Sequence, residues 1–234
     1  MKIKSLVMTL FLSLFLTIPV NAGKHWVATW ATAEQVVEPH NCPPAPYLEN
    51  NSIRQIVQVS ISGKKIRLKF SNEFSQGPVT INGAQVAIAA TAGSSSDIIE
   101  GTEKSLTFNG SSSVTIQPGE LVVSDPISFK IDNRENVAIT MQLGQASSTS
   151  VTGHPGSRTT SYIKEGQTSD FSGATATAHW YIINAIEVLA EKDARAVVVL
   201  GNSITDGRGS TTDQQNRWTD NLSRRLLENK ATKR

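Results

Sequence analysis

The sequence predicts a mostly β protein, in which an N-terminal antiparallel β-sandwich, jelly-roll-like, precedes the first βα unit of an α/β domain. Two observations carry this prediction. Short runs of alternating apolar and polar residues, separated by turn-forming pairs, fill residues 52–189. After residue 190 an unbroken aliphatic run, a glycine-rich loop and a helical pattern follow in order. We expect a β-sandwich domain over residues 23–190 and the N-terminal part of an α/β domain over residues 191–234.

The first 22 residues have the pattern of a secretory signal peptide. Two cations, Lys2 and Lys4, precede the apolar run Leu6–Val20, and Val20-Asn21-Ala22 has the small residues of a cleavage site. The run is too short to predict a membrane span, and a buried first helix would give the two lysines no role. We therefore expect cleavage near Ala22, a secreted or periplasmic protein, and no stable membrane span after cleavage.

Charge and cysteine content exclude several kinds of partner. The formal net charge of +2 falls to 0 when the two lysines of residues 1–22 are removed, because that segment holds no acidic residue. A neutral chain has no net attraction for nucleic acid. The single cysteine, Cys42, cannot form an internal disulfide, and with only His40 beside it cannot form a metal site. We expect no nucleic-acid partner, no metal and no organic cofactor.

The alternation of apolar and polar side chains predicts where the strands lie. In Lys65–Phe70 the apolar side chains occupy even positions and the cations odd positions, and Val137–Leu143 alternates in the same way. Successive side chains of a strand point to opposite faces, so each run should have one buried and one solvent-facing side. The further expected strands are Ile53–Ile61, Val79–Ile81, Val86–Ile88, Leu106–Phe108, Val114–Ile116, Leu121–Val123, Ile127–Ile131 and Trp180–Leu189. The expected turns are Ser62-Gly63, Asn82-Gly83, Asn109-Gly110, Pro118-Gly119 and Asp132-Asn133.

The pattern changes after residue 190. Ala190–Arg195 is polar and fits a linker, whereas Ala196–Leu200 is aliphatic without alternation, as in a strand covered on both faces. Trp218, Leu222 and Leu226 then recur at helical spacing. Such a strand needs neighbours for its backbone groups, and an α/β domain of ordinary size would need on the order of a hundred more residues. We therefore expect the chain to be a C-terminally truncated piece of a longer protein.

The loop between this strand and helix does not fit two nucleotide-binding patterns. A dinucleotide fingerprint needs G-x-G-x-x-G, but Gly207 and Gly209 are followed by Thr212. A phosphate loop needs G-x-x-x-x-G-K-[ST], but Gly201 and Gly207 lie one residue too far apart, and Arg208 replaces the lysine.

The nucleophile elbow of α/β-hydrolases, G-x-S-x-G, fits only in part. Gly201-Asn202-Ser203 matches its first half, but Thr205 stands where the second glycine belongs, and the tight elbow has no room for a β-branched residue. A serine nucleophile here would need a looser turn. The alternative is that Ser203 is an ordinary turn serine that caps the next helix.

The same residues resemble a family that uses such a looser turn. Gly201–Leu222, GNSITDGRGSTTDQQNRWTDNL, resembles the opening of the catalytic domain of the GDSL, or SGNH, hydrolases, in a bacterial secreted subgroup with an N-terminal β domain. Three segments resemble that β domain: HWVATWATAEQ from His25, RQIVQVSISGKKIRLKFSNEF from Arg54 and TGHPGSRTTSYI from Thr152. The resemblance spans nearly the whole chain after residue 22.

The resemblance implies a serine esterase that acts through an acyl-enzyme. Ser203 takes the place of the family's nucleophile, and its backbone N–H that of an oxyanion donor. The supporting loop corresponds to Gly201, Asn202, Thr205, Asp206 and Gly207. Asn202 departs from the family's commonest aspartate but keeps its shape and an acceptor oxygen. The implied substrates are carboxylic esters, either an acetylated polysaccharide or a lipid-like ester.

A serine nucleophile needs a histidine base with an orienting partner, which the family supplies from a D-x-x-H segment near the C-terminus of its catalytic domain. No histidine follows Ser203; His25, His40, His154 and His179 all precede it. We expect His154, in Gly-His-Pro-Gly, to have a turn role. We therefore expect this chain by itself to have little or no turnover.

A non-catalytic function remains the alternative: a carbohydrate-binding β module with a vestigial hydrolase segment. The loop Gly153–Tyr162 and the aromatic residues Trp26, Trp30, Trp180 and Tyr181 could serve either function. Single aromatic residues in a β-sandwich belong to the core more often than to a sugar-binding surface.

Overall fold

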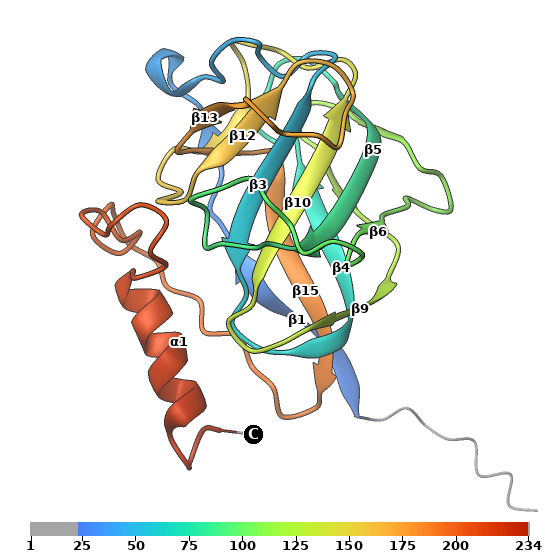
Figure 1. Ribbon diagram of the computed structural model, residues 1–234. Helices are drawn as coiled ribbons and strands as arrows, with labels where there is room; N and C mark the ends of the chain where they lie inside the picture. The colour runs from blue at the N-terminus through green and yellow to red at the C-terminus, as the bar shows by residue number, and fades with distance from the viewer. Residues whose placement is uncertain (1–22, 234) are drawn as a thin grey trace, which may run out of the picture.

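The computed structural model describes residues 23–233, which form a β-sandwich with one helix beside it (Figure 1). The paired strands run antiparallel to their neighbours throughout the described residues. The prediction of a mostly β, antiparallel fold is confirmed. The expected signal peptide, residues 1–22, lies outside the described residues.

Two large sheets form the sandwich. The five-stranded sheet has the order β1 (Lys24–Ala31), β15 (Ile183–Glu191), β4 (Gly63–Ser71) and β8 (Leu121–Val123), with β9 (Ile127–Ile131) also pairing with β4. The seven-stranded sheet has the order β13 (Thr175–Thr177), β12 (Ser161–Lys164), β3 (Ser52–Gln58), β10 (Asn136–Leu143), β5 (Val79–Ile88) and β6 (Lys104–Ser105), with β7 (Val114–Ile116) pairing with β5. A three-stranded sheet joins β14 (Trp180–Tyr181), β11 (Thr152–His154) and β2 (Gln35–Val36). The described helical elements are the 3-10 turn η1 (Pro39–Asn41) and α1 (Trp218–Glu228).

The main core lies between the two large sheets. On β4, Ile66, Leu68 and Phe70 are buried in one cluster with apolar residues of β3 and β10, whereas the cations between them face outward. Two of these cations pair with Glu187 of β15, at N–O distances of 2.6 and 2.7 Å. The alternation predicted for β4 is confirmed, and its apolar face supplies the burial that holds the two sheets together.

The outer face of the seven-stranded sheet is covered as well. Both faces of β3 and β10 are buried along most of their length. A second, smaller apolar cluster consists of Ile56, Ala89 and Ala138, with Ile98 and Tyr162 packed against them. The expectation of a solvent-facing side for Val137–Leu143 is therefore wrong, because the loop after β5, which contains Ile98, packs on that side.

Two predicted Asn-Gly turns have opposite outcomes. Asn109-Gly110 has positive φ angles of 52° and 82°, and Phe108 and Ser111 hydrogen-bond across it, so this turn is confirmed. The turn predicted at Asn82-Gly83 is wrong, because this pair lies inside β5. The pairing with β10 shifts register there, so the strand takes up the extra residue as a bulge and continues.

The long run predicted at Trp180–Leu189 forms two strands instead of one. The break falls at Ile182, whose φ is 69° and whose N–H donates to the carbonyl of Thr152 at 3.0 Å. The break places Trp180 and Tyr181 in the three-stranded sheet, where they pair with His154 and Gly153 of β11. This arrangement brings Trp180 beside the candidate site.

The α/β pattern at the C-terminal end is realised only in its helix. α1 forms where the spacing of Trp218 and Leu222 predicts it, and it stands beside the sandwich in Figure 1. The strand predicted at Ala196–Leu200 is wrong: no strand forms there, and Val198 and Leu200 are 89% and 99% exposed. No described strand lies beside this segment to pair with its backbone.

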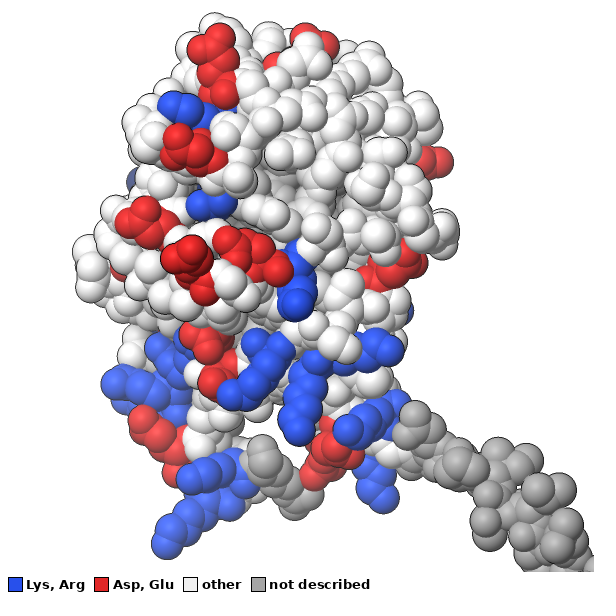
Figure 2. Space-filling model, turned by 45° about the vertical axis from the view of Figure 1, so that its right-hand side comes forward, with Lys and Arg blue, Asp and Glu red and all other residues white. Residues whose placement is uncertain are grey.

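The surface carries both signs of charge. Figure 2 shows Lys and Arg gathered over the lower half of one face, with Asp and Glu among them, whereas the charged side chains of the upper part are mostly Asp and Glu. Among residues 23–233, no helix has the length and apolar character needed to cross a lipid bilayer.

Candidate functional site

Ser203 lies on an open series of turns over residues 202–209 and not on a tight strand-to-helix elbow. Helix α1 begins only at Trp218. A side chain on Gly201 would clash with Oγ1 of Thr205, so the β-branched residue fits in the space that the glycine leaves. The looser turn that the sequence requires of a serine nucleophile is present.

The hydroxyl and the backbone N–H of Ser203 have no hydrogen-bond partner among residues 23–233, and the residue is exposed. The residue that caps the turn is Asn202, whose Oδ1 accepts the N–H of Ile204 at 3.0 Å. The carbonyl of Asn202 also accepts the N–H of Asp206, at 3.0 Å. The alternative in which Ser203 caps the next helix is wrong, because α1 begins at Trp218 and the residue at its N-cap is Arg217.

Asp206 joins the Ser203 turn to the sandwich. Its Oδ1 lies 2.9 Å from Nε2 of His154, whose Nδ1 lies 2.7 Å from the carbonyl oxygen of Ala33. The imidazole stacks on Trp180, with ring centroids 6.0 Å apart. His154 thus links the Ser203 turn, through Nε2, to the chain that follows β1, through Nδ1, a larger role than the one expected from its place in Gly-His-Pro-Gly.

A second anchor follows the turn. Asp213 accepts both the backbone N–H and the hydroxyl of Thr160, at 2.7 and 2.8 Å, and its own N–H donates to the carbonyl of Arg158 at 3.0 Å. Gln215 is buried and donates to the carbonyl of Ala92 at 2.8 Å. The bonds of Asp213 fix the chain against the loop between β11 and β12, and the bond of Gln215 fixes it against the loop after β5.

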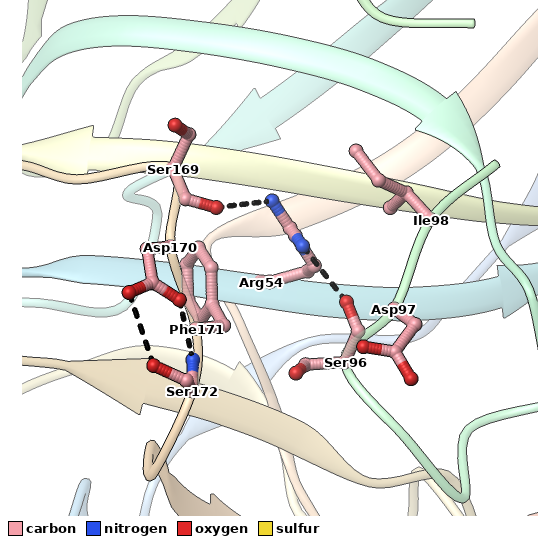
Figure 3. Close-up of a pocket in the computed structure, with 8 residues that line it drawn as sticks. All are labelled: Arg54, Ser96, Asp97, Ile98, Ser169, Asp170, Phe171 and Ser172. Atoms are coloured by element: carbon pink, nitrogen blue, oxygen red, sulfur yellow. Dashed lines mark hydrogen bonds between the residues drawn. The ribbon is translucent and has the colours of Figure 1, made fainter. Parts of the chain in front are cut away.

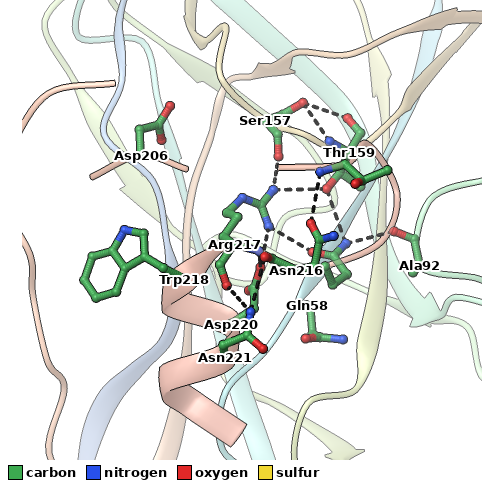
Figure 4. A network of polar contacts seen from close by, with 12 residues as sticks. Gln58, Ala92, Ser157, Thr159, Asp206, Asn216, Arg217, Trp218, Asp220 and Asn221 are labelled. Carbon is green, nitrogen blue, oxygen red and sulfur yellow. Dashed lines mark hydrogen bonds and ion pairs between the residues drawn. The ribbon is translucent and has the colours of Figure 1, made fainter. Parts of the chain in front are cut away.

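Arg217 is the third anchor (Figure 4). Its guanidinium donates to the carbonyl of Ser157 and, at 3.3 Å, to Oγ1 of Thr159, and lies 5.4 Å from the ring centroid of Trp180. A side chain on Gly207 would clash with the stem of Arg217, which explains a glycine there. We call residues 152–160 together with Trp180 the docking platform, because all three anchors contact it.

Helix α1 begins where the third anchor ends. The N–H of Arg217 donates to Oδ2 of Asp220 at 2.8 Å, which satisfies one of the free donors at the start of the helix. The indole N–H of Trp218 donates to the carbonyl of Thr205 at 2.8 Å. The first turn of α1 is therefore tied back to the Ser203 turn.

No protein-family model matches this sequence, and no curated protein matches it significantly. The case for a hydrolase therefore depends on the sequence motif and on the geometry of the Ser203 turn.

The residues predicted for the site fall together in one turn: Gly201, Asn202, Ser203, Thr205, Asp206 and Gly207. Sequence reasoning missed the anchors Asp213, Gln215 and Arg217 and the pairing of Asp206 with His154. Their only signal was that HPGSRTTS and DQQNR are unusually polar for the ends of strands and helices. Nothing in the sequence alone pairs these two segments.

The aromatic residues considered for sugar binding are not an open surface. Trp180 and Tyr181 are 5% and 0% exposed, and burial raises the pKa of Tyr181 to about 12. Trp30 packs edge-on against Trp180, with ring centroids 5.0 Å apart, and Trp26 lies under the guanidinium of Arg67. Among residues 23–233, no group of three or more His, Cys, Asp or Glu is placed to hold a metal ion.

Proposed function

We propose that the protein is an exported serine hydrolase of the GDSL, or SGNH, type, which cleaves carboxylic esters through an acyl-enzyme on Ser203. The observation that carries the proposal is the state of Ser203 in the described residues: it is exposed, and neither its hydroxyl nor its backbone N–H is engaged. A turn serine kept for structure normally bonds a nearby backbone group through its hydroxyl. Here Asn202 makes that bond, which leaves the serine free for chemistry.

The proposed reaction has two halves. Oγ of Ser203 attacks the ester carbonyl carbon while its proton passes to a base, and the carbonyl oxygen, now negative, accepts the N–H of Ser203. The bond to the alcohol oxygen breaks, and the alcohol leaves with the proton from the base. Water then attacks the acyl-enzyme by the same steps and releases the carboxylic acid.

His154 is not the base in this proposal, because both of its ring nitrogens face acceptors, Asp206 and the carbonyl of Ala33. We assign the base to the histidine of the D-x-x-H pair that the family resemblance implies. Residues 204–234 contain no histidine, so the chain of residues 1–234 is expected to show little or no turnover by itself.

The exposure of the turn favours a substrate that reaches it from solvent. Ser203 is exposed and lines neither of the two cavities described, so an ester carried on a polymer could approach it from solvent. We favour an acetylated polysaccharide over a lipid-like ester because an exported protein with a β domain suits a polymeric substrate.

The proposal is tested by the coding sequence downstream of codon 234. A continuation that encodes a D-x-x-H segment supports a hydrolase, and the longer protein should hydrolyse p-nitrophenyl acetate, with activity lost in Ser203→Ala. A stop at the same codon in several independent isolates, with no such segment nearby, would contradict the proposal. Turnover by residues 1–234 themselves would contradict the assignment of the base.

A further inference from the structure

A cleft of about 420 Å³ lies on the outer face of the seven-stranded sheet, and the Ser203 turn contributes none of its lining residues (Figure 3). One wall is the loop after β5, with Ser96 and Asp97, and the other is the loop after β12, with Ser169 and Asp170. Its volume falls within the range of roughly 300–1,000 Å³ that small-molecule sites occupy. The guanidinium of Arg54, from β3, lies between the two walls.

Arg54 brings a positive charge that no described carboxylate neutralises by direct contact. The residue is 3% exposed, and its guanidinium makes three hydrogen bonds, all to neutral acceptors. These are Oγ1 of Thr140 at 2.9 Å, the carbonyl of Ser96 at 2.8 Å and the carbonyl of Ser169 at 3.1 Å. A guanidinium has five N–H donors, so two remain available.

The surroundings of this guanidinium favour an anionic partner. The ring of Phe171 lies 4.3 Å from its central carbon, which fixes the plane of the guanidinium and excludes water from one side. Burial lowers the pKa of Arg54, and Glu103 and Asp97 offset only part of that effect. A buried charge without a contacting counter-ion is unfavourable, so a ligand carboxylate at the two free donors would be stabilised.

The rim of the cleft carries negative charge, in contrast to the positive charge of Arg54 inside it. Asp97 is exposed and its carboxylate accepts no hydrogen bond from the described residues. The carboxylate of Asp170 accepts from the N–H and the hydroxyl of Ser172, at 2.8 and 3.0 Å, which holds it in place with lone pairs to spare. Figure 3 shows these two carboxylates on opposite sides of Arg54. Carboxylates at the rim repel a compact anion but accept hydrogen bonds from hydroxyl groups.

We propose that this cleft binds a sugar acid, whose carboxylate takes the two free N–H groups of Arg54 and whose hydroxyls donate to Asp97 and Asp170. A ligand with only one of these features satisfies only one part of the cleft. The site is separate from Ser203, so the proposal does not depend on ester hydrolysis.

The test is a titration of the purified chain, followed by the backbone amide signals of residues 96–98 and 169–172. Glucuronate should shift these signals in a saturable way. Glucose, acetate and inorganic phosphate should each bind at least about tenfold more weakly, because a charge-assisted hydrogen bond contributes a factor of that order. No saturable shift with glucuronate overturns the proposal. If glucose binds as tightly as glucuronate, Arg54 does not select for a carboxylate. If acetate or phosphate binds as tightly, the rim does not select for hydroxyl groups. Either result overturns the proposal.

Variants separate the two parts of the cleft. Arg54→Lys keeps the charge but loses the fork of donors, and should weaken glucuronate binding about tenfold or more. Asp97→Asn tests the rim at an exposed position and should weaken glucuronate more than acetate. Glu100→Gln, on the same loop, is the matched control and should bind as the wild type does. If Arg54→Lys does not fold, Asp97→Asn decides: unchanged glucuronate binding in that variant contradicts the proposal.

Discussion

Replacing Glu34 with glutamine should stabilise the protein at alkaline pH and leave it nearly unchanged at acid pH. Burial raises the pKa of Glu34 to about 8, because hydrogen bonds from Asn184 and Ser71 offset only part of the desolvation and Glu73 adds repulsion. The side-chain oxygen Oε2 accepts from Asn184 at 3.0 Å, whereas the buried Oε1 has no hydrogen-bond partner among the described residues. The folded protein therefore keeps a proton that the unfolded chain releases.

The sign and size of the effect follow from the pKa. The unfolded chain loses this proton above its ordinary pKa of 4.5 and the folded protein only near about 8. The free energy of unfolding should therefore fall as the pH rises from about 4.5 to about 8 and change little above that. The difference corresponds to on the order of 5 kcal/mol at about 1.36 kcal/mol per pH unit. Glutamine cannot ionise, so Glu34→Gln removes this loss.

Urea unfolding followed by tryptophan fluorescence between pH 4 and pH 9 measures the effect. Glu34→Gln should gain several kcal/mol over wild type at about pH 9 and almost nothing at about pH 4. Glu49→Gln, an exposed glutamate with no hydrogen bond to a described residue, is the control and should follow the wild-type curve. Equal stability of Glu34→Gln and wild type at pH 9 would refute the reasoning.

The docking of the Ser203 turn gives further predictions. Gly156→Ala places a methyl group against Asp206 and its histidine partner, so hydrogen exchange of the Ser203 turn should accelerate while the sandwich strands keep their protection. Unchanged exchange would show that the ion pair does not hold the turn. Asp213→Ala removes two hydrogen bonds to the docking platform and should raise exchange over residues 203–216 about tenfold to a hundredfold. Thr212→Ala, at an exposed position beside it, is the control and should change little. Ser203→Ala should alter the free energy of unfolding by less than about 0.5 kcal/mol, because its hydroxyl bonds no described group, and a larger loss by urea titration would give it a structural role.

Local pattern was enough to predict only part of the sandwich: β1, β12 and β13 were not predicted, and the strand predicted at Leu106–Phe108 does not form. Period-two alternation alone predicts the position of β4, because one of its faces packs on the core and the other carries charged residues. β7, β8 and β9 have the predicted bounds, since turn residues separate them. β10 shows where the rule fails: its second face is apolar enough to accept a covering loop, and alternation cannot reveal a cover that comes from elsewhere in the chain.

Non-local pairing decided the remaining differences. Asn82-Gly83 is a strong turn signal, but β10 runs past it and keeps both sides of the pair in one strand. Ala196–Leu200 has strong strand propensity and still forms no strand, because propensity alone does not supply the partner that its backbone needs. The β11 strand and the docking platform were missed for the same reason, since His154 and Asp206 meet only in the folded protein.

The central claim is that the hydroxyl of Ser203 accepts an acyl group, and mass spectrometry of acid-quenched reactions tests it most directly. A protein that carries residues 1–234 together with the D-x-x-H segment would be mixed with p-nitrophenyl acetate and digested. One acetyl group should appear on the peptide that contains Ser203, should be absent in Ser203→Ala, and should persist in the nearby control Ser210→Ala. Hydrolysis without an acetylated peptide, or the same acetylation in Ser203→Ala, would contradict the account.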